Sequence, residues 1–184
     1  MPFFVVLILI IAGCVGLDQL TKIIVCNTLE IGENVPLIEG VFEFIHIKND
    51  GMAFGLLGEH RWVFITISVV GILALCLYLF RFSTDSRLTK IGMALIIGGG
   101  IGNMIDRSLP PYLVTDMLQM TFLGDLFPWV FNVADSFVCV GVGIVILGLV
   151  LDIIKEYKEK KQATEQPEEI EQVKEEAPND SDCE

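Results

Sequence analysis

Four long apolar stretches divide the chain. Uncharged residues run over 1–17, 62–80, 91–105 and 136–151. A helix needs about 20 mostly apolar residues to cross a bilayer. The second stretch nearly reaches that length, and the other three reach it with their charged flanks. The chain is also 53% hydrophobic with a mean hydropathy of +0.63, above the usual range of soluble domains. The pattern therefore predicts a mainly α-helical membrane protein with four transmembrane helices.

The first stretch has an alternative interpretation as a cleavable secretory signal. It lacks a basic n-region and a small-x-small cleavage site, and DQLTK (18–22) follows without a break. We therefore expect the stretch to stay in the protein as its first span.

The basic residues predict which ends of the spans face the cytoplasm. Three bases lie in 81–90 and four in 155–161, whereas 26–60 holds one base against six acids and 108–128 holds none. Cytoplasmic loops carry the excess of Lys and Arg. Both termini and the 81–90 loop are thus predicted to be cytoplasmic, with 26–60 and 108–128 outside.

The outer segment 26–60 has a strand-like pattern. VPLIEGVFEFIHIKN (35–49) is rich in β-branched and aromatic residues between the turn-forming GEN and NDG. It predicts a short strand pair, a small extracytoplasmic β platform, with GMAFGLLG (51–58) at the membrane interface. The alternative is a plain connector.

The acidic charge is concentrated at the C-terminus. Residues 155–184 contain five lysines and eleven acids and so supply −6 of the formal net charge of −12. The polar run from Gln162 onward has no aromatic residue, a composition typical of disorder. We expect a membrane domain over 1–158 and a disordered, cytoplasmic acidic tail over 159–184.

Three carboxylates interrupt the spans at one depth. Because successive spans alternate in direction, Asp18, Asp106 and Asp135 all fall near the outer leaflet, level with Lys22 and Arg107. A charge at bilayer depth costs about 2.5–3.5 kcal/mol on the mildest scale and is a functional hypothesis by default. The alternative is that these groups form ion pairs that only hold the helices together.

The residue inventory excludes several chemistries. His46 and His60 belong to no HExxH pattern, which argues against a zinc hydrolase. Ser136 has no nucleophile-elbow context, and Cys139 lies in an apolar setting that disfavours a thiolate. GGGIGN (98–103) lies inside a span and is not followed by a Lys-Ser/Thr pair, so it indicates close helix packing rather than phosphate binding.

Paired carboxylates are left as the candidate chemistry. Two carboxylates can share a proton, so that one activates water while the other polarises a carbonyl. The residues by themselves leave open which acid pairs with Asp135. The candidates are Asp18, Asp106, Asp116 and Asp125.

Five motifs together resemble those of the lipoprotein signal peptidases, the signal peptidase II family of bacterial membrane aspartyl proteases. They occur in the family's order over residues 15–140, and are DQLTK (18–22), NDGMAFG (49–55), GGGIGNMIDR (98–107), the V-x-D element at Asp116 and FNVADS (131–136). The stretch from Asp116 to Phe131 and the acidic tail are less similar to the family.

The resemblance implies that Asp116 and Asp135 form a catalytic dyad. The residues that it implies line or brace the pocket are Asp18, Lys22, Asn49, Gly51, Asn103, Asp106, Arg107, Asn132 and Ala134. It implies an endopeptidase that removes signal peptides from prolipoproteins, cutting before a diacylglyceryl-modified cysteine without a metal or a cofactor. It further implies a monomer in the bacterial cytoplasmic (inner) membrane that binds the family's cyclic-peptide inhibitors, with no nucleic-acid partner.

Two other functions compete with the peptidase. An ion-coupled carrier would need polar groups that continue towards the cytoplasm, and the inner halves of the spans offer almost none. A non-enzymatic scaffold would tolerate Asp116→Asn, which the peptidase would not.

Overall fold

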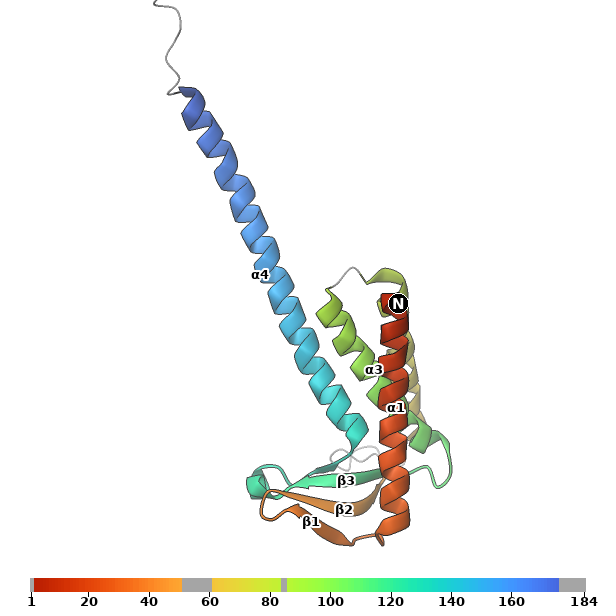
Figure 1. Ribbon diagram of the computed structural model, residues 1–184. Helices are drawn as coiled ribbons and strands as arrows, with labels where there is room; N and C mark the ends of the chain where they lie inside the picture. The colour runs from red at the N-terminus through yellow and green to blue at the C-terminus, as the bar shows by residue number, and fades with distance from the viewer. Residues whose placement is uncertain (1, 51–60, 84–85, 176–184) are drawn as a thin grey trace, which may run out of the picture.

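A bundle of long helices forms the body of the protein (Figure 1). The computed structural model describes residues 2–50, 61–83 and 86–175. The helices are α1 (Phe3–Thr28), α2 (Arg61–Leu77, continued by the π-helical turn η1, Tyr78–Phe82), α3 (Arg87–Ser108) and α4 (Val133–Glu175). Their membrane-spanning stretches are Phe3–Thr28, Ile65–Phe82, Arg87–Ser108 and Val133–Gln162. The four predicted spans are confirmed.

Helix α3 is the centre of the bundle. Half of its membrane-spanning stretch is buried inside the protein, against 6–17% for the other three. It packs against α1, α2 and α4. The buried core consists of Leu7, Leu79, Met93, Ala94 and Ile97, and the outer faces of the other helices present apolar side chains, as a lipid environment requires.

Glycines let α1 and α4 approach α3 closely. A Cβ on Gly102 would lie 2.6 Å from Asp18 Oδ2 and 3.3 Å from Ala134 Cβ. A Cβ on Gly99 would collide with the Ala134 carbonyl oxygen. The close packing predicted for GGGIGN is therefore confirmed, and it brings the polar residues of three helices together.

A four-stranded antiparallel sheet lies at one end of the bundle (Figure 1). Its strands, in spatial order, are β1 (Asn34–Ile38), β2 (Phe42–Asn49), β3 (Val114–Met120) and β4 (Val130–Phe131). The predicted strand pair over 35–49 is confirmed. The sequence did not reveal that β3 and β4, which lie between α3 and α4 in the chain, join the same sheet. In this pairing Asp116 on β3 lies opposite Ile47 on β2. The interfacial segment expected at 51–58 lies outside the described residues.

Helix α4 runs on to Glu175 and projects well beyond the other helices (Figure 1). Its exposed turns carry i,i+4 ion pairs, Lys155–Glu159 and Lys160–Glu156, which favour the helix. The disordered acidic tail expected over 159–184 stays a prediction. Residues 176–184 lie outside the described part of the chain.

Candidate active site

Asp135 lies in the first turn of α4 and forms a reciprocal cap with Asn132. The Asp135 backbone N–H donates to Asn132 Oδ1 at 2.9 Å, and the Asn132 backbone N–H donates to Asp135 Oδ2 at 3.2 Å. This is a capping box with Asp in the place usually taken by Glu or Gln. A helix N-terminus also favours a negative charge. The local structure therefore offsets part of the cost of placing a carboxylate at the start of a span.

Two side-chain amides connect Asp135 to Asp116. Asn103 Nδ2 donates to Asp135 Oδ1 at 2.7 Å. Asn132 Nδ2 donates to Asn103 Oδ1 at 3.0 Å and to Asp116 Oδ1 at 2.6 Å. Asn132 is completely buried and uses both of its amide hydrogens and its oxygen in this network, which fixes its orientation. Of the four candidate partners, Asp116 is the one joined to Asp135 in this way.

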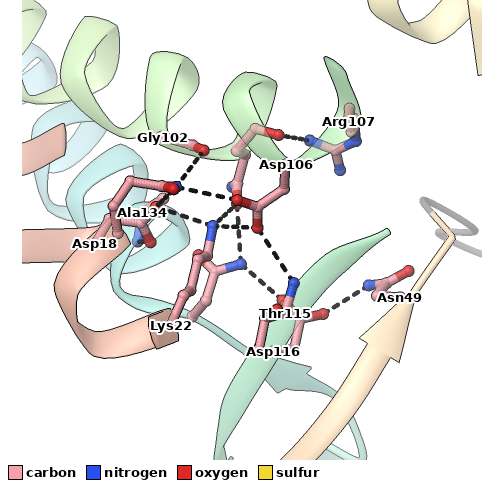
Figure 2. A network of polar contacts seen from close by, with 12 residues as sticks. Asp18, Lys22, Asn49, Gly102, Asp106, Arg107, Thr115, Asp116 and Ala134 are labelled. Carbon is pink, nitrogen blue, oxygen red and sulfur yellow. Dashed lines mark hydrogen bonds and ion pairs between the residues drawn. The ribbon is translucent and has the colours of Figure 1, made fainter. Parts of the chain in front are cut away.

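Asp116 is 2% exposed and lies on β3, beside β2. Its Oδ2 accepts a hydrogen bond of 2.7 Å from Asn49 on β2 (Figure 2). Burial raises the pKa of Asp116 to about 6, and the negative charge of Asp135 adds to the increase. The hydrogen bonds from Asn49 and Asn132 and the charge of Lys22 act in the opposite direction. Asp116 is thus placed to exchange a proton near neutral pH.

Lys22 holds a second layer of charges behind the two aspartates. Its ammonium lies 2.9 Å from Asp18 Oδ2, 2.9 Å from Asp106 Oδ2 and 3.0 Å from Asn103 Oδ1 (Figure 2). Each of its three hydrogens therefore has an acceptor. Asp18 is completely buried, and its Oδ1 accepts a hydrogen bond of 2.9 Å from the backbone N–H of Ala134. This bond ties the first turn of α4 to α1.

Asp106 connects the helices to the sheet. Its Oδ1 accepts from Gln19 Nε2 at 3.0 Å, and its Oδ2 accepts from the backbone N–H of Thr115, next to Asp116, at 3.2 Å. Asp106 also forms an ion pair with Lys22. Arg107, the next residue in α3, donates to the Asn103 carbonyl at 3.4 Å and interacts electrostatically with Asp135, Asp116 and Asp106.

An apolar groove leads along the bundle to this network. It has a volume of about 510 Å³ and runs between α2, α3 and α4. Ser68, Gly71, Ile72 and Leu75 line its α2 side, and its polar end is formed by Asn103, Arg107 and Asp135. A long apolar ligand with a polar end fits this distribution of side chains.

The structure brings most of the expected site residues together. Asp18, Lys22, Asn49, Asn103, Asp106, Arg107, Asp116, Asn132, Ala134 and Asp135 lie in one region of connected polar contacts. Gly51 lies outside the described residues, and Asp125 is exposed in the short helix η2 (Thr121–Leu126).

Gln19 and Thr115 were missed from the sequence. Gln19 lies inside the DQLTK motif, and that motif could have indicated it as a site residue. No motif or pattern in the sequence indicated Thr115. In the described ranges, no three His, Cys, Asp or Glu side chains are grouped to hold a metal ion.

Solved structures similar to this chain define its class. Two carry titles that describe a bacterial membrane enzyme solved by the in meso method, at 2.3 Å and 1.9 Å resolution. Both are 30% identical to this chain, with TM-scores of 0.73 and 0.72. The matches cover 80% and 78% of this chain and 89% and 92% of the solved chains. The fold is that of a bacterial membrane enzyme.

Sequence comparisons identify the family. The family model described as signal peptidase (SPase) II matches residues 8–151. The lipoprotein signal peptidase of Brevibacillus brevis is 38% identical over 144 residues, which cover 78% of this chain and 94% of that protein. The lipoprotein signal peptidase of Bacillus subtilis is 35% identical over 160 residues, which cover 87% and 100% of the two chains. The chain belongs to the signal peptidase II family of proteases, as its motifs suggested.

Proposed function

We propose that this protein is an aspartic endopeptidase that removes signal peptides from prolipoproteins and cuts before a cysteine that carries a diacylglyceryl group. Asp116 and Asp135 are its catalytic dyad. The observation that carries the proposal is a carboxylate, Asp135, at the polar end of an apolar groove, connected through Asn103 and Asn132 to a second carboxylate, Asp116. Membership of the signal peptidase II family supports the reaction class.

The environments of the two aspartates suggest their roles. Asp116 is the more buried and has the raised pKa, so it holds the shared proton and donates a hydrogen bond to the scissile carbonyl. Asp135 faces the groove and takes a proton from the attacking water. The resulting tetrahedral intermediate collapses as the peptide nitrogen receives a proton from the dyad. The two carboxylates titrate as a pair, so the observed pKa values belong to the dyad as a whole.

The groove suggests how the substrate is held. Its apolar walls on α2 and α3 would take the acyl chains of the diacylglyceryl group, which then need not leave the membrane. The scissile peptide bond would lie at the polar end, beside Asp135 and Arg107. Asn49 on β2 and the edge of the sheet would lie over the peptide.

The proposed orientation places the sheet and the dyad near the outer leaflet of the cytoplasmic membrane. The N-terminus and the far end of α4 lie at the end of the bundle away from the sheet (Figure 1). The basic residues of 81–90 and 155–161 mark that end as cytoplasmic. The dyad would then meet the lipidated cysteine of a translocated substrate.

Asparagine substitutions test the dyad. Asp116→Asn and Asp135→Asn should each abolish cleavage of a lipidated prolipoprotein while the folded protein still accumulates in the membrane. Asparagine keeps the size of the side chain but can neither act as a carboxylate base nor share a proton. Asp106→Asn should lose thermal stability together with activity, because it weakens the contacts to Lys22 and Thr115.

The measurement is cleavage, protein level and thermal midpoint for each variant. Asp125→Asn, an exposed carboxyl in η2, is the matched control and should behave as wild type. The same prolipoprotein without its diacylglyceryl group should not be cut. Full activity in the Asp116 variant would refute the dyad. A stable, inactive Asp106 variant beside an active Asp116 variant would move the catalytic role to Asp106.

A further inference from the structure

A second cluster of reactive groups lies outside the proposed dyad, where α1 meets the sheet. Cys26, in the last turn of α1, is exposed. Its sulfur lies 3.1 Å from Lys48 Nζ, 3.6 Å from Thr115 Oγ1 and 3.8 Å from His46 Nε2. Thiol, ammonium and imidazole groups from α1 and β2 therefore converge on one point.

The orientation of His46 is set by the backbone. Its Nδ1 lies 2.8 Å from the Leu29 carbonyl oxygen. A carbonyl oxygen can only accept, so Nδ1 must carry a hydrogen. In the neutral ring Nε2 is then the acceptor, and it is the atom that faces Cys26. The ring is 4% exposed, so it is held in this position.

Lys48 is also held in place. Its ammonium donates to Thr115 Oγ1 at 2.8 Å as well as to the Cys26 sulfur. Reactive cysteines in proteins occupy partly exposed, electropositive surroundings of this kind.

A pocket of about 260 Å³ opens beside the sulfur. Cys26, Asn27 and Lys48 line one part of it, and Leu113 and Pro111 line another. Lys22 and Asp106 also reach its wall, where they are paired with each other. The pocket leaves room for a small group attached to Cys26, with the Lys48 ammonium beside it.

We propose that Cys26 is a thiol modification site that forms a mixed disulfide with small anionic disulfides. His46 Nε2 takes the thiol proton as the sulfur attacks one sulfur of the reagent. The Cys26–reagent S–S bond forms, the reagent's own S–S bond breaks, and the leaving thiolate departs and is protonated from His46 or water. Lys48 favours an anionic reagent by its charge. The proposed orientation puts this thiol on the side of the membrane where disulfides persist.

The experiment follows disulfide exchange on the full-length protein in detergent, in a Cys183→Ser background. The anionic probe is 5,5′-dithiobis(2-nitrobenzoate) and the neutral probe is 2-hydroxyethyl disulfide. Peptide mapping by mass spectrometry separates Cys26 from Cys14, Cys76 and Cys139, and N-acetylcysteine serves as the free-thiol reference. Cys26 should react with the anionic probe at least about tenfold faster than the reference.

Two variants test the roles of the neighbours. His46→Asn can keep the hydrogen bond to the Leu29 carbonyl but removes the base. It should slow the reaction by about tenfold, less than a positioned base usually contributes, because the distance from sulfur to nitrogen is 3.8 Å. Lys48→Met should slow the anionic probe more than the neutral one.

Three outcomes would overturn the proposal. The first is that Cys26 reacts with the anionic probe no faster than N-acetylcysteine does. The second is an unchanged rate in a His46→Asn protein that keeps its thermal midpoint. The third is equal slowing of both probes by Lys48→Met, which would remove the preference for an anion.

Discussion

Lys22 offers the sharpest test of the buried charge network. The change is Lys22→Met, which keeps a long, unbranched side chain and removes the ammonium. Lys22 is 4% exposed and pairs with two carboxylates, of which Asp18 is completely buried and Asp106 is 10% exposed. Removal of the ammonium leaves both acids without their shared cation.

The expected loss of stability is large. Breaking a buried ion pair by removing one partner costs about 3–5 kcal/mol. In a chain of this size each kcal/mol lowers the thermal midpoint by about 2–4 °C, so the variant should melt about 6–20 °C below wild type. Asp18 keeps its hydrogen bonds from Gln19 and Ala134, and Asp106 keeps its hydrogen bond from Thr115. Because these bonds still stabilise the two acids, the loss should stay within this range. Cleavage should fall too, because Asn103 loses one of the two donors that orient its oxygen.

The assay is thermal unfolding of purified protein in detergent, with Lys155→Met as the control. Lys155 is 76% exposed and pairs with Glu159 at 3.8 Å, and exposed pairs of this kind contribute little. The double variant Lys22→Met/Asp106→Asn should be less destabilised than the sum of its parts, because one of the two uncompensated charges is gone. Equal thermal midpoints for the Lys22 and Lys155 variants, or additive effects in the double variant, would refute the reasoning.

Three further predictions test the protonation of the proposed dyad, the topology and the tail. Asn49→Ala removes a hydrogen bond that lowers the pKa of Asp116. Because the proposed mechanism needs the proton on that acid, kcat/KM should fall as pH rises through about 6 in wild type, and this fall should occur at higher pH in the variant. A shift of the pH profile to lower pH would contradict this assignment. In intact cells a membrane-impermeant thiol reagent should label Cys26 and should reach Cys183 only after permeabilisation; labelling of Cys183 without permeabilisation would reverse the orientation. Deletion of 163–184 should leave cleavage largely intact, since the tail is proposed to lie across the membrane from the dyad, and a large loss of specific activity at unchanged protein level would show that the tail contributes.

The sequence determined the parts of this protein that depend on local patterns. Apolar runs of span length predict membrane helices wherever they occur, since crossing a bilayer is a property of the segment itself. The β-branched and aromatic residues of 35–49, between turn-forming segments, likewise predicted β1 and β2. The polar, acidic composition of 159–184 likewise predicts a disordered tail, and that stays a prediction.

The network of amides that connects Asp135 to Asp116 was decided by the tertiary structure. From the residues alone four acids remained candidates for the partner of Asp135, and only the motifs of a known family favoured Asp116. The contacts that single it out join residues far apart in the chain, such as Asn49 to Asp116 and Asn103 to Asp135. The pairing of β2 with β3 and the close approach of α3 to α4 create these contacts. The small residues of GGGIGN predicted close packing of α3 but not which helices it meets, and no local pattern in the sequence encodes the strand pairing.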